Sequence, residues 1–327
     1  MILEMVHLQL TGRCNLNCWF CGQRKKDWSA MKKEELQPEE WMGIVEWLEE
    51  YSKKQKLKPS VMIWGGEAIL SPAFEQVVRR LHAGGFRLGM ITNGTLLHQN
   101  AELISEAFDK IYISVDGSEI DHDEIRGKGA YQKIRENLQM LKPHKPQRIL
   151  MMVLTEKTVP KLKQILKDFE VFEPDQVILQ DMIFLEKEEI EQYKCWMQEE
   201  FGKTATEIDA WLGTSKDRET RDQVSAECLE QIKDMELSYN LQYLPHISDV
   251  KSSHCLSPFR HIHIMWNGEV SFCTDHTDFS CGSVRDASPD ILFKNELADK
   301  FRESVMQGKC ATCKHCSWRY RDSFLEL

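Results

Sequence analysis

Residues 5–21, MVHLQLTGRCNLNCWFC, join a loosely alternating apolar segment to a short loop that carries three cysteines. The alternation predicts a β-strand that leads directly into the loop. Cys14, Cys18 and Cys21 have C-x3-C-x2-C spacing, with an aromatic residue, Phe20, before the last cysteine. Three thiolates can hold three of the four irons of a cubane cluster, which leaves the fourth iron open for chemistry. Three unrelated buried thiols or a zinc loop are the alternatives, but structural zinc needs a fourth ligand and no obvious one follows.

The composition excludes several broad classes of protein. The chain has 327 residues, of which 42% are hydrophobic, and a formal net charge of −10. An acidic chain whose nearest approach to a basic run is Arg24-Lys25-Lys26 is not a general binder of nucleic acids or membrane surfaces. No stretch has the length and apolar character of a membrane span, and the start lacks a signal-peptide layout, so we expect a cytoplasmic protein. Eleven cysteines in a reducing compartment favour metal ligands and free thiols over disulfides.

Short apolar runs alternate with helical patterns over the first half of the chain. After the first strand, the runs that predict strands cover residues 60–64, 87–92, 110–115, 148–154 and 176–180. Six strand-and-helix units imply right-handed βαβ connections and a parallel sheet, but they are fewer than the eight of a closed barrel. We therefore predict an α/β fold, a partial (β/α)6 TIM-like barrel. The loops that follow its strands, including the cysteine loop, should lie on one face.

The second half of the chain changes character twice. Residues 186 to about 240 are rich in Glu, Lys and Gln, with helical spacing and no strand signal. Residues 262–266 and 269–272 then flank Asn267-Gly268, a pair typical of a two-residue type I′ hairpin turn. The sequence thus predicts a barrel over 1–185, a helical linker over 186–254, and a C-terminal hairpin-plus-helix domain over 255–327.

The cysteine loop resembles the signature of the radical S-adenosylmethionine (SAM) superfamily, and further segments resemble the other motifs of that superfamily in order. They are Gly65-Gly66-Glu67, with Ala68 where the family's GGEP motif has proline, Thr92-Asn93-Gly94-Thr95, and Ser114-Val115-Asp116-Gly117 followed by His122-Asp123 and Arg126-Gly127. The resemblance implies a [4Fe–4S] cluster bound by Cys14, Cys18 and Cys21, with SAM on its open iron as the source of a 5′-deoxyadenosyl radical. It also implies which residues contact SAM: Phe20, Gly65, Gly66, Glu67, Asn93, Ser114 and Arg126. His122 and Asp123 are expected to be structural.

Five C-terminal cysteines form a second candidate metal site. They occur as Cys255-x12-Gly268-x4-Cys273 and Cys310-x2-Cys313-x2-Cys316, and four soft ligands can close a second cubane. The pattern resembles the SPASM/twitch extension of radical SAM enzymes. The resemblance predicts one auxiliary [4Fe–4S] cluster, held by Cys255, Cys273 and two of the last three cysteines, with Cys313 and Cys316 preferred over Cys310. A zinc ion bound by the same cysteines is the alternative.

Three further cysteines, Cys195, Cys228 and Cys281, lie outside both sets of expected ligands. Packing in the core is the expected role of each. Some radical SAM relatives use a thiol to give a hydrogen atom to a substrate radical, which inverts a stereocentre. If one of the three has that role, we expect Cys228, with Cys281 as the second choice.

The resemblance leaves the substrate open. Because the chain starts at the first predicted barrel strand, we expect no separate leader-binding domain, and this expectation favours a small polar molecule such as a sugar over a peptide. The sequence hypothesis is hydrogen abstraction from a C–H bond and epimerisation of a carbohydrate or similar substrate. The alternatives are radical dehydrogenation of an alcohol and maturation of a ribosomally made peptide through a thioether link or an epimerised residue. The family implies a flavodoxin or ferredoxin as electron donor; the non-enzymatic alternatives are an iron–sulfur electron carrier and a zinc-stabilised binding protein.

Overall fold

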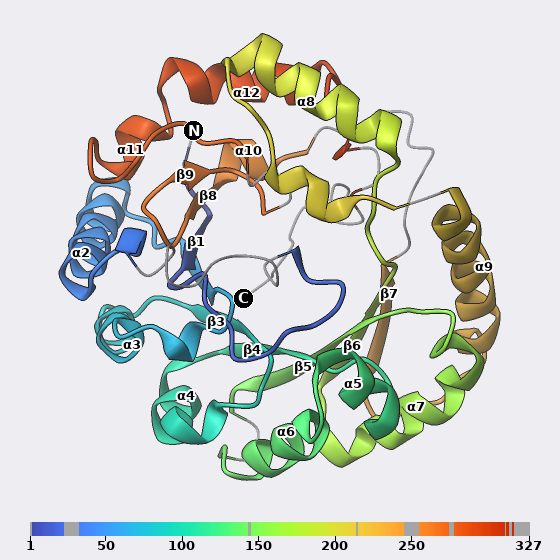
Figure 1. Cartoon of the computed structure of the whole chain (residues 1–327). Coiled ribbons are helices and arrows are strands. Elements are labelled where there is room, and N and C mark those ends of the chain that lie inside the picture. The colour runs from blue at the N-terminus through green and yellow to red at the C-terminus, as the bar shows by residue number, and fades with distance from the viewer. Residues whose placement is uncertain are drawn as a thin grey trace.

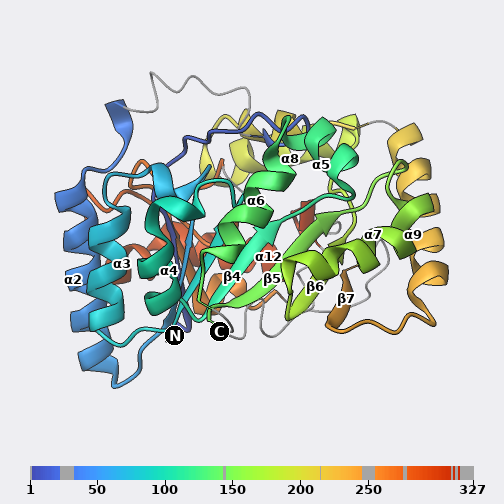
Figure 2. The same ribbon diagram turned by 90° about the horizontal axis from the view of Figure 1, so that it is seen from below.

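One curved sheet, open on one side, forms the centre of the molecule. The computed structural model describes residues 2–22, 33–142, 145–213, 215–244, 255–274, 278–310, 312–313 and 316. Within these residues the strand order is β7-β6-β5-β4-β3-β2-β1-β8-β9, and the helices lie around the outside of the sheet (Figure 1). The view from below shows β4, β5, β6 and β7 side by side, with α2, α3 and α4 at one end of the molecule and α7 and α9 at the other (Figure 2).

The strands of the first half lie close to their predicted bounds. They are β1 (Met5–Gln9), β2 (Ser60–Trp64), β3 (Leu88–Thr92), β4 (Lys110–Ser114), β5 (Gln147–Val153) and β6 (Gln176–Gln180), followed by β7 (Asn240–Leu244), β8 (His261–Ile264) and β9 (Val270–Ser271). The neighbouring strands from β7 to β8 are parallel, and β9 runs antiparallel to β8. The predicted partial barrel with parallel strands is confirmed.

The helices follow the strands of the barrel along the chain, and α2 begins where local sequence chemistry favours a helix start. They are α2 (Pro38–Gln55), α3 (Phe74–Ala83), α4 (Ala101–Ala107), α5 (Glu119–Arg126), α6 (Ala130–Gln139), α7 (Leu162–Asp168), α8 (Lys187–Phe201), α9 (Ser215–Ile232), α10 (Ser257–Arg260), α11 (Pro289–Leu292) and α12 (Glu296–Met306). In α2, proline occupies the first turn and the Glu40 carboxylate accepts a hydrogen bond of 2.7 Å from the Gln37 amide. None of the described helices has the length and hydropathy of a membrane span.

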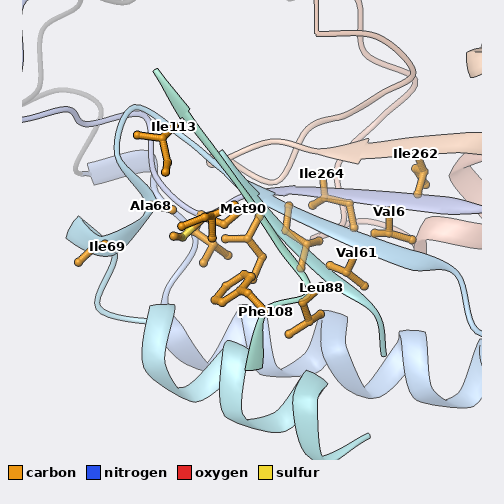
Figure 3. Close-up of a cluster of buried hydrophobic side chains, with 14 of the residues drawn as sticks. Val6, Val61, Ala68, Ile69, Leu88, Met90, Phe108, Ile113, Ile262 and Ile264 are labelled. Carbon is orange, nitrogen blue, oxygen red and sulfur yellow. The ribbon is translucent and has the colours of Figure 1, made fainter. Parts of the chain in front are cut away.

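Alternating side chains divide the core into two layers. Val6, Val61, Leu88 and Ile262 come from four strands and pack on the outer face of the sheet, beneath the helices (Figure 3). The alternate residues face inward, where a second apolar cluster crosses the sheet. Its members are Met5, Met62, Tyr112, Ile149, Ile178 and Leu244. Burial on both faces explains why the strands read as continuous apolar runs.

The second half of the chain corrects two expectations. The segment predicted as a helical linker, 186–254, contains β7, which pairs in parallel with β6. The C-terminal hairpin is not separate from the barrel, because β8 pairs in parallel with β1 and extends the same sheet. The physical division between the barrel and the C-terminal region is therefore less sharp than the sequence pattern indicates.

The predicted type I′ turn at Asn267-Gly268 is wrong. Gly268 has φ +89°, but Asn267 is not among the described residues with positive φ. The Gly268 amide donates to the Met265 carbonyl at 2.9 Å, and the Met265 amide donates to the Glu269 carbonyl at 2.8 Å. These bonds enclose a three-residue loop with glycine in the left-handed position, the next most common hairpin geometry.

Candidate active site

The three N-terminal cysteines lie together in the loop after β1, at the carboxyl edge of the parallel sheet. The Cys21 amide donates to the Cys18 carbonyl at 3.1 Å, which folds the loop back on itself. Burial raises the pKa of Cys14 to about 11 and also raises the pKa of Cys18. Cys18 lies close enough to Cys14 for its negative charge to raise the pKa of Cys14 as well, and Cys21 has the same effect on Cys18. The three thiols are therefore neighbours. A metal that binds these thiols as thiolates must displace their protons.

Polar N–H groups from three different elements point at the sulfurs. The Leu16 amide lies 3.4 Å from Cys14 Sγ, and Asn93 Nδ2 lies 3.7 Å from the same sulfur. Arg126 Nη1 lies 3.8 Å from Cys18 Sγ. Hydrogen bonds to sulfur and a nearby positive charge stabilise thiolate ligands and tune an iron–sulfur cluster. The donor set therefore fits a cluster held by these cysteines.

Arg126 is held in place by a buried carboxylate. Its Nε donates to Asp116 Oδ2 at 2.5 Å, and the two side chains are 10% and 0% exposed. Asp116 Oδ1 also accepts from the Val153 amide at 2.9 Å, and the Asp116 amide donates to His122 Nδ1 at 3.1 Å. His122 is thus an internal acceptor at the start of this network, which agrees with its predicted structural role.

The Gly65-Gly66-Glu67 segment packs against the start of the cysteine loop. The Gly66 amide donates to the Thr11 carbonyl at 2.9 Å, and the Glu67 amide donates to the Arg13 carbonyl at 2.8 Å. A Cβ at Gly66 would lie 2.2 Å from the Arg13 carbonyl oxygen, closer than any real contact. These glycines therefore allow one backbone to approach another, a reason that the sequence analysis did not give.

The Glu67 side chain joins the ends of β2 and β3. Its carboxylate is fully buried and accepts hydrogen bonds from Thr92 Oγ1 at 2.9 Å and from the Asn93 amide at 2.8 Å. Burial raises its pKa to about 7, although these hydrogen bonds lower it. The hydrogen bonds of this carboxylate thus shape the loop, and its predicted contact with the amino group of SAM stays a prediction.

A cavity of about 540 Å³ borders the cysteine loop. Its lining includes Phe20 and Cys21 from the loop, Gln180 and Asp181 at the end of β6, and Trp211. Asp181 is fixed by hydrogen bonds from Ser225 Oγ at 2.7 Å and Tyr243 OH at 2.9 Å. The cavity combines aromatic surface with oriented polar groups, as ligand sites do.

Four C-terminal cysteines gather at a second site. A hydrogen bond with Cys310, burial, and the nearby thiols of Cys310, Cys273 and Cys316 raise the pKa of Cys313. Cys255 comes just before α10 and packs, like Cys313, against the main hydrophobic core. The sulfur atoms of Cys273 and of the cysteines in 310–316 thus meet in one part of the fold, although they are far apart in sequence, and the predicted ligand role of Cys255 stays a prediction.

Two family profiles match these two sites. The radical SAM superfamily profile matches residues 8–169, and the profile of SPASM, an iron–sulfur cluster-binding domain, matches residues 255–317. The chain belongs to the radical SAM superfamily. Its radical SAM domain implies a [4Fe–4S] cluster and SAM, and its SPASM domain implies auxiliary iron–sulfur clusters.

Relatives of this radical SAM protein differ in what they make. The AdoMet-dependent heme synthase of Methanosarcina barkeri is 22% identical over 330 residues, which cover 95% of this chain and 88% of that protein. The sporulation killing factor maturation protein SkfB of Bacillus subtilis is 26% identical over 163 residues, 49% of this chain and 38% of SkfB. The chain therefore spans well under half of SkfB.

Solved radical SAM structures share the fold. Streptococcus suis SuiB bound to SAM gives a TM-score of 0.63 at 12% identity, over 100% of this chain and 78% of SuiB. The structure of anSMEcpe with bound AdoMet and the Cp18Cys peptide gives 0.63 at 16% identity, over 100% of this chain and 92% of that one. At these identities the likeness establishes the partial barrel and C-terminal SPASM domain.

The other residues expected to contact SAM lie around the same loop of this radical SAM protein. The Phe20 ring lies 5.7 Å from the Arg126 guanidinium carbon. Asn93 is 6% exposed and bonds Asn15 Oδ1 at 3.0 Å, and Ser114 is half-buried at the end of β4. The structure brings these side chains to the carboxyl edge of the sheet; their contacts with SAM stay predictions.

The candidate hydrogen donors of this radical SAM protein are buried, although the charge of Asp181, which lines the cavity, acts on Cys228. Cys228 on α9 is fully buried in the outer core, and Cys281 is 2% exposed in the same core, with its Sγ 3.4 Å from the Val270 carbonyl. Burial raises the pKa of each thiol to about 12. Cys195 is exposed on α8. Burial of Cys228 and Cys281 agrees with packing in the core, whereas the packing role predicted for Cys195 is wrong; the donor roles stay predictions.

Sequence reasoning missed two groups that shape the site of this radical SAM protein. Asp116 is the buried partner of Arg126, and its place after the strand that ends at Ser114 was the available signal. Arg13 forms an ion pair of 3.1 Å with Glu35 and donates to the Leu70 carbonyl at 3.3 Å. No sequence pattern links Arg13 to either partner.

Proposed function

We propose that this protein removes a hydrogen atom from a C–H bond of a small polar substrate, with net oxidation of that substrate. When bound, a [4Fe–4S] cluster with SAM at its open iron supplies the 5′-deoxyadenosyl radical that takes the hydrogen. The observation that carries the proposal is the convergence of Leu16, Asn93 and Arg126 on the sulfurs of Cys14 and Cys18.

The chain's own residues supply positioning and charge. Arg126 is a fixed cation beside Cys18, suited to the carboxylate of SAM as well as to the sulfur. The aromatic residues Trp19 and Phe20 shield one side of the cavity that borders Cys21. Asp181, whose carboxylate is held by Ser225 and Tyr243, and Gln180 offer polar groups there, which suit hydroxyl groups of a polar substrate.

Net oxidation is preferred to epimerisation because of where the thiols lie. Epimerisation by the route expected from the sequence needs a thiol beside the substrate, and Cys228 and Cys281 are buried in the outer core. Oxidation of an alcohol to a carbonyl instead requires the loss of the C–H hydrogen, the hydroxyl proton and a second electron. The cysteines around Cys313 provide ligands for a group that can accept that electron.

The first test is SAM cleavage. The anaerobically reconstituted protein, reduced with dithionite or with a flavodoxin or ferredoxin system, should convert SAM to 5′-deoxyadenosine. The matched control is Cys18→Ser, which should form none. An electron carrier or a zinc-stabilised binding protein would give no 5′-deoxyadenosine in either case, and that result would overturn the proposal.

The second test separates the reactions. Polyols, aminocyclitols and sugars are screened for those that increase 5′-deoxyadenosine formation, and the products are analysed after reaction in heavy water. Oxidation gives a carbonyl product and no solvent deuterium at the reacting carbon. An inverted carbon that carries one deuteron would replace oxidation with epimerisation. Stimulation by peptides alone would move the substrate class to that of the SkfB- and SuiB-like relatives.

A further inference from the structure

Three histidines meet on the inner face of the sheet. His7 lies in β1, and His261 and His263 lie in β8, the strand that joins β1 from the C-terminal region. The parallel register places His7 opposite His263, and Met5 opposite His261. The cluster therefore depends on the pairing of β1 with β8 and has no counterpart in a local sequence motif.

The three side chains are close enough to share one ligand. One ring nitrogen from each lies within 4.8 Å of those of the other two. The rings of His7 and His263 are 4.0 Å apart and nearly parallel, and those of His7 and His261 are 5.7 Å apart. Because zinc–nitrogen bonds are about 2.0–2.1 Å long, nitrogens that share one ion lie within about 4 Å of each other, so the stacked rings of His7 and His263 must rotate apart to bind it.

The surroundings of the cluster favour a ligand over simple packing. His7 is 2% exposed and His263 is 3% exposed, and His263 Nδ1 has no hydrogen-bond partner among the residues described by the structure. A buried ring nitrogen without a partner is costly, and a metal ion would satisfy it.

The cluster is also in the protonation state that metals require. Burial lowers the pKa of His261 to about 4 and that of His263 to about 3, and burial together with His263 and His261 lowers that of His7. At neutral pH each ring is therefore uncharged and keeps a lone pair for coordination.

We propose that His7, His261 and His263 bind a divalent transition-metal ion of the zinc class. Imidazole nitrogens suit zinc, and three protein ligands leave a fourth position for water. Since the ligands come from β1 and β8, the ion fastens the C-terminal hairpin to the first strand of the barrel.

Metal analysis tests the site directly. The anaerobic protein with its iron–sulfur clusters loaded is treated briefly with a mild chelator and titrated with zinc, and bound metal is counted by mass spectrometry. The wild-type protein should retain about one zinc ion per chain. His261→Ala and His263→Asn should weaken zinc binding by about tenfold or more, because each removes one of three ligands. His82→Ala is the matched control on the exposed face of α3 and should retain the ion.

Spectroscopy of the wild-type protein decides the ligands even if a variant fails to fold. Zinc K-edge absorption should show nitrogen neighbours at about 2.0–2.1 Å, whereas sulfur at about 2.3 Å would mean that zinc occupies the cysteine sites. Zinc should also raise the unfolding temperature of the wild type but not that of His261→Ala. Sulfur ligation, failure to retain zinc, or full retention by the histidine variants would each overturn the proposal.

Discussion

The guanidinium of Arg126 lies 3.8 Å from the sulfur of Cys18, so a fixed positive charge faces one of the cluster ligands. The Asp116 carboxylate, which is fully buried, forms an ion pair with this guanidinium and fixes its position. The sequence spacing between α5 and the cysteine loop gives no hint of this contact. It arises because the loop after β4 and the loop after β1 meet at the same edge of the sheet.

Arg126→Met should destabilise the protein and make its cluster harder to reduce. Removing the cation leaves the Asp116 carboxylate buried and unpaired, a change that costs about 3–5 kcal/mol in comparable buried pairs. The loss of positive charge beside Cys18 should shift the cluster's reduction midpoint to a more negative potential. Denaturant unfolding and a redox titration followed by electron paramagnetic resonance measure the two effects.

Two variants serve as controls for Arg126→Met. Asp116→Asn combined with Arg126→Met should recover part of the lost stability, because no buried charge remains. Arg79→Met breaks an ion pair whose side chains are 59% exposed and should change stability by about 0.5 kcal/mol or less. Equal losses in Arg126→Met and Arg79→Met would contradict the role given to Asp116.

Gly66→Ala should destabilise the loops at the carboxyl edge of the sheet. The added Cβ would lie 2.2 Å from the Arg13 carbonyl oxygen and 2.4 Å from its carbon, so the backbone of the cysteine loop must move. We expect a loss of about 4 kcal/mol or more, or no soluble protein. Gly43→Ala, in α2 with open space around it, should instead stabilise by about 0.5–1 kcal/mol. Thermal unfolding of both variants checks the contrast.

Much of the barrel was predictable because its signals are local. Strands β2 and β6 match the predicted runs at both ends, since each is a short apolar segment bounded by polar or glycine residues. β7, NLQYL, was missed because its residues are only partly buried and follow long polar helices. The pairing of β8 with β1 joins segments that are far apart in the sequence, and no local pattern encodes such a contact.

Iron analysis should distinguish the two cysteine sets. With one cluster at each, the reconstituted wild type should contain about eight iron atoms per chain. Cys273→Ser with Cys313→Ser should retain about four and still form 5′-deoxyadenosine. The matched variant Cys14→Ser with Cys18→Ser should also retain about four but form none. A wild type with only about four iron atoms would contradict the auxiliary cluster, and a further increase would indicate more than one.

Lowering the pH should destabilise the wild-type protein more than it destabilises the His122→Gln variant. Burial lowers the pKa of His122 to about 4, and its Nδ1 accepts a hydrogen bond from the Asp116 amide, so the folded state keeps the ring neutral. Below the unfolded pKa of about 6.5 the unfolded chain binds the extra proton, and stability is lost as the pH falls. Between pH 7.5 and 5.5 the protonation of this residue in the unfolded chain should lower the free energy of unfolding by about 1 kcal/mol.

The measurement for His122 compares how the free energy of unfolding changes with pH in the wild type and in the His122→Gln variant. Urea unfolding at several pH values gives the pH dependence of wild type and variant, and glutamine keeps an acceptor for the Asp116 amide. The other buried histidines contribute equally to both proteins, so their effects cancel. Identical slopes for the two proteins would show that His122 is not kept neutral by the fold.

In the candidate site the cysteine ligands could be predicted from the sequence, but the contacts of the surrounding side chains could not. The cysteine ligands follow from spacing, because a loop of eight residues brings its own thiols together. The side chains that surround them, including Asn93 and Arg126, were named from motifs, but their partners depend on the packing of three separate loops. Glu67 shows the difference, since its carboxylate turns toward Thr92 and Asn93.

The pairing of β1 with both β2 and β8 has a consequence for how the protein is made. β1 leaves the ribosome before β8, so the edge of β1 that pairs with β8 has no partner until residues 261–264 have been translated. An open strand edge invites aggregation, so the nascent chain needs protection during synthesis. We therefore expect cluster delivery to the loop after β1 to follow translation rather than accompany it.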